Sequence, residues 1–98
     1  MDRRVVWTAD AQISRRLIFD YWNNSNKSKG YSKKLNTMFF AALQLVSKLP
    51  DIGKPTDIDN INLITVSHFQ IGYYVTNKAI IVLKLWDTRQ NPNNSPLK

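Results

Sequence analysis

The hydrophobic positions follow a helical rhythm through the first half of the chain and alternate as in strands through the second half. A short β-type run, Val5–Trp7, precedes the first helical stretch. Thr8 is a suitable N-cap residue, and we expect a helix from about Ala9 to Asn23. The residues expected on its apolar face recur at helical spacing: Ile13, Leu17 and Tyr21, with Ile18 and Trp22 widening the stripe.

The most regular stretch of the sequence predicts a second helix, because its apolar residues follow the i, i+4, i+7 spacing over about five turns. The residues with this spacing are Tyr31, Leu35, Met38, Phe39, Ala42, Leu45, Val46 and Leu49. The helix must end before Pro50, since proline lacks a backbone N–H and restricts the residue before it. The intervening segment NNSNKSKG is typical of a loop, so the two helices should form a hairpin.

Beyond the turn segment PDIGKPT the apolar period changes to two, which indicates strands. Three strands are expected, at Ile61–Val66, Phe69–Val75 and Ala79–Trp86. The last of these is apolar at nearly every position before Lys84, as expected of a strand buried on both faces.

The element order β-α-α-β-β-β predicts an α+β fold. The helical hairpin and the sheet each have one apolar face, so the economical arrangement has two layers. We expect an antiparallel sheet with the two-helix hairpin packed on one face. The other face would then carry His68, Gln70 and Tyr74 toward solvent or a partner.

The length of 98 residues fits a single domain, which we place at residues 1–92, with residues 93–98 as a C-terminal tail. The absence of cysteine excludes disulfides and thiolate metal sites. No apolar run approaches the roughly 18 residues that a membrane span requires. The first residues lack the apolar region of a signal peptide, so we expect a cytoplasmic protein without membrane contact.

The net charge and the absence of common motifs limit the partners and reactions that the sequence allows. Fourteen Lys and Arg against seven acidic residues give a formal charge of +7, which favours nucleic acid or an acidic protein as partner. The chain has no Gly-rich phosphate loop, no His-x-x-x-His and no Gly-x-Ser-x-Gly motif. His68 is its only histidine, so we predict no metal and no cofactor. His68 is either an ordinary surface residue or a single acid or base near neutral pH.

The sequence changes abruptly at the end of the last predicted strand, where it reads WDTRQNP. Arg89 follows the buried strand closely, so the strand end would hold its guanidinium at a defined place. A fixed guanidinium suits bidentate binding of phosphate or carboxylate. Alternatively, Asp87 and Arg89 form a salt bridge and Asn91–Pro92 simply ends the strand. Residue chemistry alone leaves both interpretations open.

Several segments resemble the RelE/ParE family of bacterial type II toxin–antitoxin toxins. They are VVWTADA, YSKKLNTMFFAALQLVSKLPDIGKPT and HFQIGYYVTNKAIIVLKLWDTRQNP, which together cover nearly the whole chain. The resemblance implies a toxin that is neutralised by a cognate antitoxin, whose C-terminal segment wraps around it. It also implies that the protein reaches operator DNA only through the antitoxin.

Two classes of target follow from this resemblance. RelE-like members cleave mRNA in the ribosomal A site without metal, and ParE-like members poison DNA gyrase. Arg89 matches the arginine that RelE-like nucleases place near the scissile phosphate, where it would stabilise developing charge. Other positions depart from the nuclease set: Gln70 replaces an arginine, Ile61 and Leu63 stand where lysines are expected, and Ser95 replaces a tyrosine.

These departures favour a ParE-like toxin that poisons gyrase. The alternatives are a RelE-like, ribosome-dependent mRNA endoribonuclease and an inactive relative that only binds an antitoxin. The candidate residues for target or nucleic-acid binding are Arg89, Lys54, Lys84, Gln70 and Tyr74, and the candidate catalytic residues are Arg89 and His68. An acidic amphipathic antitoxin segment suits the basic, apolar-aromatic chain, with Tyr21 and Trp22 as candidate anchors.

Overall fold

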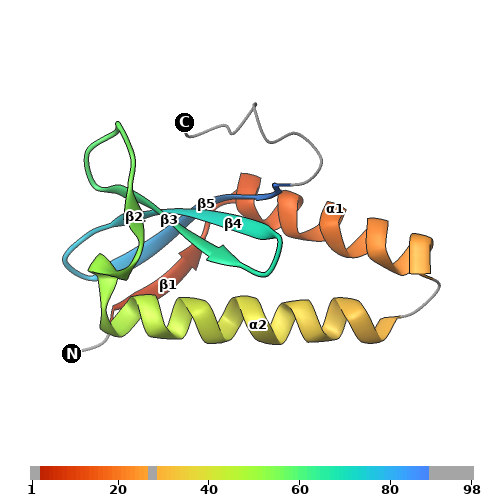
Figure 1. The fold of residues 1–98 in the computed structure, drawn as a ribbon. Coiled ribbons are helices and arrows are strands. Elements are labelled where there is room, and N and C mark those ends of the chain that lie inside the picture. The colour runs from red at the N-terminus through yellow and green to blue at the C-terminus, as the bar shows by residue number, and fades with distance from the viewer. Residues whose placement is uncertain (1–2, 27–28, 89–98) are drawn as a thin grey trace.

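The computed structural model describes residues 3–26 and 29–88, which form two helices, a short 3₁₀ turn and five strands (Figure 1). In chain order they are β1 (Arg4–Trp7), α1 (Ala9–Asn26), α2 (Lys29–Lys48), the 3₁₀ turn η1 (Pro50–Ile52), β2 (Lys54–Pro55), β3 (Ile61–Val66), β4 (Phe69–Val75) and β5 (Ala79–Asp87). The α+β class and the predicted order of helices and main strands are confirmed. The short strand β2 lies in the segment that was predicted to be only a turn.

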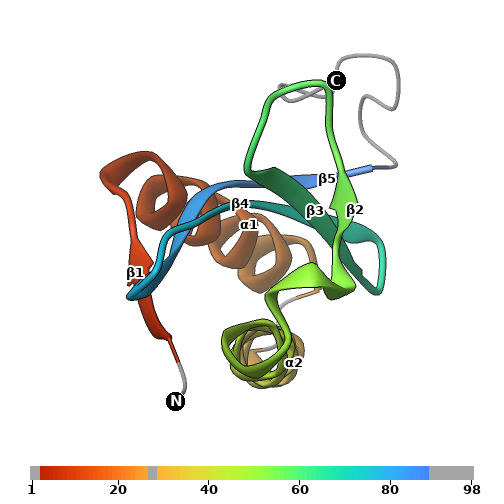
Figure 2. The same cartoon turned by 90° about the vertical axis from the view of Figure 1, so that its left-hand side faces the viewer.

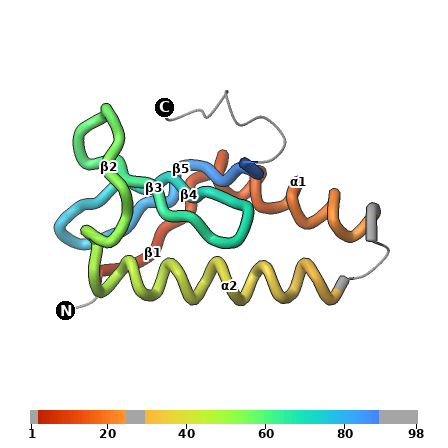
Figure 3. Tube along the Cα trace, viewed as in Figure 1, coloured from red at the N-terminus to blue at the C-terminus, as the bar shows by residue number. Residues whose placement is uncertain are grey.

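The sheet has the order β1-β5-β4-β3-β2. Strands β2 to β5 pair antiparallel, as predicted for β3 to β5, whereas β1 pairs with β5 in parallel, so the prediction of an antiparallel sheet is wrong at this edge. The sheet is therefore mixed. A parallel pair needs a long connection between its strands, and here the two helices and three other strands supply it. Figure 3 shows the consequence, with β1 lying beside β5, the last strand.

Both helices cover the same face of the sheet (Figure 2), as the two-layer prediction required. The α1 helix packs mainly on β5, and α2 contacts β1, β3 and β5. The largest fully buried side chains come from α2, β4 and β5: Leu35, Phe39, Leu43, Val46, Phe69, Ile71, Tyr73, Ile80 and Val82. None of the helices in the described ranges is long and apolar enough to cross a membrane.

The start of α1 is fixed to the sheet by Thr8. The Thr8 hydroxyl accepts the Ala11 N–H at 3.1 Å, which confirms it as the N-cap. The same hydroxyl donates to the Leu83 carbonyl of β5 at 3.1 Å. One side chain therefore sets both where α1 begins and where it meets the sheet.

The predicted apolar face of α1 is correct for Ile18 and Trp22, which pack against the core, but wrong for its central stripe. Ile13, Leu17 and Tyr21 are 57%, 63% and 50% exposed, so the stripe faces solvent. The buried side of α1 is centred instead on Ala11, with Ile18, Phe19 and Trp22 packed against the core cluster. Helical spacing shows that a stripe exists, but it cannot choose between two partly apolar faces of one helix.

The predicted face of α2 is largely correct, with differences near its C-terminal end. Leu45 and Leu49 are 49% and 54% exposed, whereas Leu43 is buried. The helices are also longer than predicted, because α1 continues to Asn26 and α2 begins at Lys29. Most of the predicted loop NNSNKSKG is thus helical. Ser32 joins the two helices, since its buried hydroxyl lies 2.7 Å from Asn23 Oδ1.

Candidate functional site

The face of the sheet that the helices leave uncovered, here called the outer sheet face, carries four of the five candidate target-binding residues: Lys54, Gln70, Tyr74 and Lys84. In β4 the residues Phe69, Ile71 and Tyr73 are fully buried toward the helices. Their neighbours Gln70 and Tyr74 must point the other way, because successive strand side chains alternate. The predicted exposure of Gln70 and Tyr74 on this face follows, with Gln70 half-buried and Tyr74 exposed.

Strand register arranges the outer sheet face in three cross-strand rows. The middle row is Lys54, Leu63, Gly72 and Lys84, from β2 to β5. On one side of it lie Thr65, Gln70 and Trp86, and on the other Ile61, Tyr74 and Ile81. Residues in directly paired positions share a face of the sheet, so all three rows project away from the helices.

A β-bulge keeps this arrangement in register. The pairing of β4 with β5 shifts between Gly72 and Tyr73, where Gly72 pairs with Lys84 but Tyr73 pairs with Val82. Leu83 is the extra residue. Because of it, Lys84 and Ile81 lie on the same face although an odd number of positions separates them. Without the bulge, Lys84 would share a face with the buried Val82.

The outer sheet face is apolar at its centre and cationic only at its sides. Lys54 and Lys84 are both exposed, but β3 and β4 lie between their strands. Three strand spacings of about 4.8 Å place their backbones roughly 14 Å apart. Leu63 and Gly72 occupy the middle positions of the row between them. The rows contain no acidic residue.

His68 lies at one end of the sheet, in the turn between β3 and β4, and is exposed. Its carbonyl accepts both the N–H and the hydroxyl of Thr88, each at 2.9 Å, so the turn is fastened to the end of β5. Asp87, the last residue of β5, is buried. Arg89, the first candidate catalytic residue, lies outside the described residues.

Tyr21 and Trp22 lie on α1, away from the outer sheet face. Trp22 packs edge-on against Tyr31 of α2, with ring centroids 4.7 Å apart, and against Tyr21 at 5.3 Å. Trp22 is partly buried against the core, whereas Tyr21 is 50% exposed to solvent. Of the two candidate antitoxin anchors, Tyr21 presents the larger surface to solvent.

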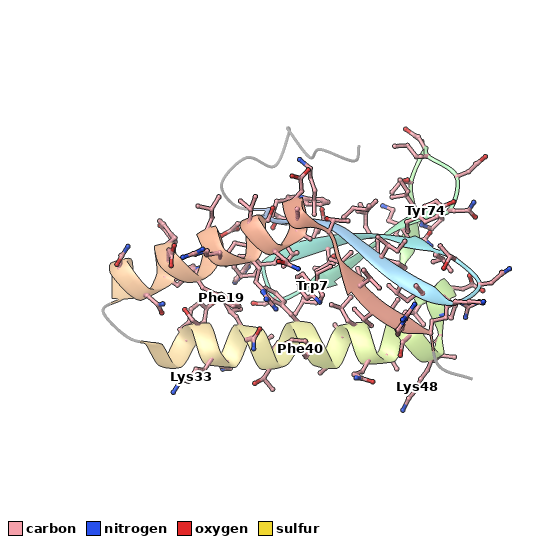
Figure 4. The ribbon with its side chains drawn as sticks, turned by 180° about the vertical axis from the view of Figure 1, so that it is seen from behind. Trp7, Phe19, Lys33, Phe40, Lys48 and Tyr74 are labelled. Carbon is pink, nitrogen blue, oxygen red and sulfur yellow. The ribbon has the colours of Figure 1, made fainter. Side chains whose placement is uncertain are left out.

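A second surface feature was missed in the sequence. Between α1, α2 and β1 runs a groove, here called the hairpin groove, with Trp7, Phe19 and Phe40 along it (Figure 4). The Arg15 guanidinium lies over the Trp7 ring, 4.5 Å from its centroid, and 5.9 Å from that of Phe40. The sequence gives no sign of this contact, because Trp7 and Phe40 come from other elements than Arg15 does.

The described residues contain no group of three or more His, Asp or Glu side chains placed to hold a metal ion. What the structure presents is two surfaces: an apolar-centred sheet face and a basic, aromatic groove on the helix side. Neither is assembled around a cluster of acidic or histidine ligands.

Together the two helices and the mixed five-stranded sheet form a ParE-like fold. The structure is similar to a chain of the chromosomal ParDE TA system from P. aeruginosa, with a TM-score of 0.73 and 16% sequence identity. The match covers 87% of this chain and 95% of that one. No family model and no curated protein matches the sequence. The similarity confirms the fold that the sequence segments predicted.

Proposed function

We propose that this protein is the toxin of a type II toxin–antitoxin system and that it acts by binding a protein target, DNA gyrase, through the outer sheet face. The ParE-like fold supports the toxin assignment. The composition of the outer sheet face supports action by binding rather than by cleavage.

The observation that carries this proposal is the row Lys54, Leu63, Gly72 and Lys84 with its apolar neighbours. Cleavage of RNA without metal needs a base and several cations gathered around one phosphate. The rows of this face instead gather Ile61, Leu63, Tyr74, Ile81 and Trp86. Aromatic and aliphatic residues with few charges are typical of the centre of a protein–protein interface.

The first experiment is induction of the gene in cells that lack any neutralising partner, with measurement of growth and of plasmid supercoiling. We expect growth arrest and loss of gyrase-dependent negative supercoiling. Purified toxin should inhibit gyrase in a supercoiling assay, and Tyr74→Ala and Trp86→Ala should each raise the concentration needed by roughly tenfold, as truncation of an interface anchor does.

Tyr21→Ala is the matched control, because Tyr21 is also an exposed tyrosine but lies on α1. It should inhibit gyrase as the wild type does. Gyrase that remains fully active at large molar excess of toxin would rule out the proposed target. Arrested growth with shortened messages, reversed by Arg89→Ala, would establish the RelE-like nuclease instead. Harmless induction would identify an inactive relative.

A neutralising antitoxin is the expected partner of such a toxin. The net charge of +7 favours an acidic one, because opposite charges accelerate association and disfavour wrong partners. Coexpression of an acidic protein encoded beside this gene should restore growth. Contact with operator DNA would then pass through that protein.

A further inference from the structure

The connection between β2 and β3, residues 56–60 and here called the β2–β3 loop, stands out from the sheet. Figure 2 shows it rising on the side away from α2, which is the side of the outer sheet face. Its end is fastened to β4, since the Val75 N–H donates to the Asn60 carbonyl at 3.2 Å. The next residue, Ile61, pairs with Tyr74, which lies at the base of the loop (Figure 4). The β2–β3 loop therefore borders the outer sheet face.

The Thr56 side chain holds the β2–β3 loop in a defined shape. Its hydroxyl accepts the Ile58 N–H at 3.1 Å and donates to the Ile61 carbonyl at 2.9 Å. The Thr56 N–H donates to the same Ile61 carbonyl at 3.1 Å, and the Ile61 N–H donates to the Ile58 carbonyl at 3.2 Å. These bonds fix the backbone of Ile58 relative to the outer sheet face before any partner arrives.

Ile58 is an unusual residue for an exposed loop. Its side chain is 51% exposed, whereas loops ordinarily carry small or polar residues at their tips. The residues that favour a turn are already present around it, in Asp57, Asp59 and Asn60. An exposed isoleucine gains free energy when a partner buries it, and its β-branched side chain has few rotamers to lose. Ile58 therefore has the properties of an interface anchor.

The charge of the β2–β3 loop is opposite to that of the chain as a whole. Residues 56–60 include Asp57 and Asp59, both exposed, and no lysine or arginine, in a chain of net charge +7. Carboxylates repel the phosphates of a nucleic acid, and an aliphatic side chain does not stack on a base as an aromatic ring does. An acidic protein is disfavoured by the same charges. A cationic protein surface fits both carboxylates.

From these features we propose that the β2–β3 loop is part of the target-binding surface and that Ile58 enters an apolar pocket of a protein target. Lysine or arginine at the edge of that pocket would meet Asp57 and Asp59, while Tyr74 contacts the adjoining surface of the target. That the target is gyrase rests on the proposed function. The chemistry of the pocket rests on the loop. A second copy of this chain is the poorer occupant, because two molecules of charge +7 repel each other.

The first experiment uses the full chain and purified gyrase, with inhibition of supercoiling and the dissociation constant as readouts. Ile58→Ala should raise both the inhibitory concentration and the dissociation constant by roughly fivefold or more, as loss of an interface anchor does. Ile13→Ala is the matched control, because Ile13 is an isoleucine of similar exposure, 57%, on α1. It should bind as the wild type does. Both variants change exposed side chains, and thermal unfolding followed by circular dichroism should match that of the wild type.

The two carboxylates are tested together with a variant that carries Asp57→Asn and Asp59→Asn. Its association with gyrase should slow by roughly threefold or more, because charges at the rim of an interface act mainly on the association rate. The control carries Asp10→Asn and Asp20→Asn, which remove the same charge from exposed positions of α1 and should slow association less. Faster or unchanged association of the loop variant would indicate an anionic or uncharged contact and would overturn the proposal.

Thr56 is a positioning residue in this proposal, because it acts on the target only through Ile58. Thr56→Ala should weaken gyrase binding by roughly threefold, since the loop must then be ordered on binding. Thr56→Ser keeps the hydroxyl and should restore the wild-type dissociation constant. A Thr56→Ser variant that binds as weakly as Thr56→Ala would contradict this role of the hydroxyl.

Growth assays separate this proposal from the proposed function. Gyrase inhibition that Tyr74→Ala relieves and Ile58→Ala does not would keep the proposed function and reject the role of the loop. Growth arrest that Ile58→Ala relieves while gyrase stays fully active would keep the loop and reject gyrase as the target. Self-association of the chain that Ile58→Ala abolishes, measured by sedimentation velocity, would assign the loop to a second copy and overturn the proposal.

Discussion

At the scale of single residues, Tyr73 has the most demanding environment. Its side chain is fully buried in the smaller core cluster with Val46 and Ile80, yet its hydroxyl donates to the Pro50 carbonyl at 3.0 Å. Burial raises the pKa of Tyr73, a backbone hydrogen bond with Gly53 lowers it, and the nearby Asp51 charge raises it further. The hydroxyl thus ties the 3₁₀ turn after α2 to the centre of the sheet.

Tyr73 should make stability fall at alkaline pH. Its folded pKa is raised, so the folded state keeps the proton longer than the unfolded state. The stabilising contribution is full below the ordinary tyrosine pKa of about 10 and is lost as pH rises toward the folded value. Urea unfolding at pH 8, 10 and 11 should show this loss, and Tyr73→Phe should reduce it. Tyr74→Phe, at the next and exposed position, should retain it.

Gly53 leaves space for the Tyr73 hydroxyl because glycine has no side chain. A Cβ at position 53 would meet the Tyr73 hydroxyl and lie 2.9 Å from the Leu63 carbonyl oxygen. We expect Gly53→Ala to lower the free energy of unfolding by about 1–3 kcal/mol, the usual cost of overpacking. Removing the hydroxyl with Tyr73→Phe should reduce that cost, so the two changes should not be additive in a double-mutant cycle. Additive effects would disprove the contact.

At the scale of elements, α1 shows how far the sequence could predict the structure. The existence, type and order of both helices and of four strands follow from the short β-type run Val5–Trp7, from periodicity, and from Thr8 and Pro50. The face of α1 that packs on the sheet could not be predicted in this way. Ala11 and Ile18 lie on one apolar face and Ile13 and Leu17 on another, and only the position of β5 decides which face is buried. The hydrophobic pattern is a local property of the sequence, whereas burial depends on which distant strand packs against the helix.

The same reasoning separates the two surfaces. The outer sheet face could be predicted in part, since alternation along β4 places Gln70 and Tyr74 together. Its rows could not, because the bulge at Leu83 shifts Lys84 relative to Ile81 and nothing in an apolar strand marks a bulge. The hairpin groove combines Trp7, Arg15 and Phe40 from three elements, so no sequence window contains it.

Substitutions on the two faces of the hairpin test the corrected packing. Leu17→Gln, at an exposed position, should change the free energy of unfolding by less than about 0.5 kcal/mol. Leu35→Ala, at a fully buried position of α2, should cost about 2–5 kcal/mol, because it removes core contacts and leaves a cavity. Chemical denaturation measures both. A large loss in Leu17→Gln would restore the face first expected from the sequence.

At the scale of the whole molecule, the net charge of +7 and the apolar centre of the outer sheet face predict different responses of binding to salt. If the partner is an acidic antitoxin, as proposed, its association with this protein should slow as salt is raised from about 0.05 to 0.5 M, because screening shortens the range of attraction. The dissociation rate should change less. Stopped-flow measurements would show this, and a salt-independent association rate would contradict electrostatic steering. Binding through the apolar centre of the outer sheet face should respond more weakly to salt.

The parallel pairing of β1 with β5 has a consequence for synthesis in the cell. The Thr8 hydroxyl donates a hydrogen bond to the Leu83 carbonyl, a contact across 75 residues of the chain. In the sheet, β5 lies between β1 and β4. A growing polypeptide therefore cannot complete the sheet until β5 has left the ribosome, and contacts at such separation form slowly. The outer sheet face depends on β5 for Ile81, Lys84 and Trp86. A nascent chain would acquire that surface only after β5 has left the ribosome, which gives a cotranslational partner time to meet the earlier helices first.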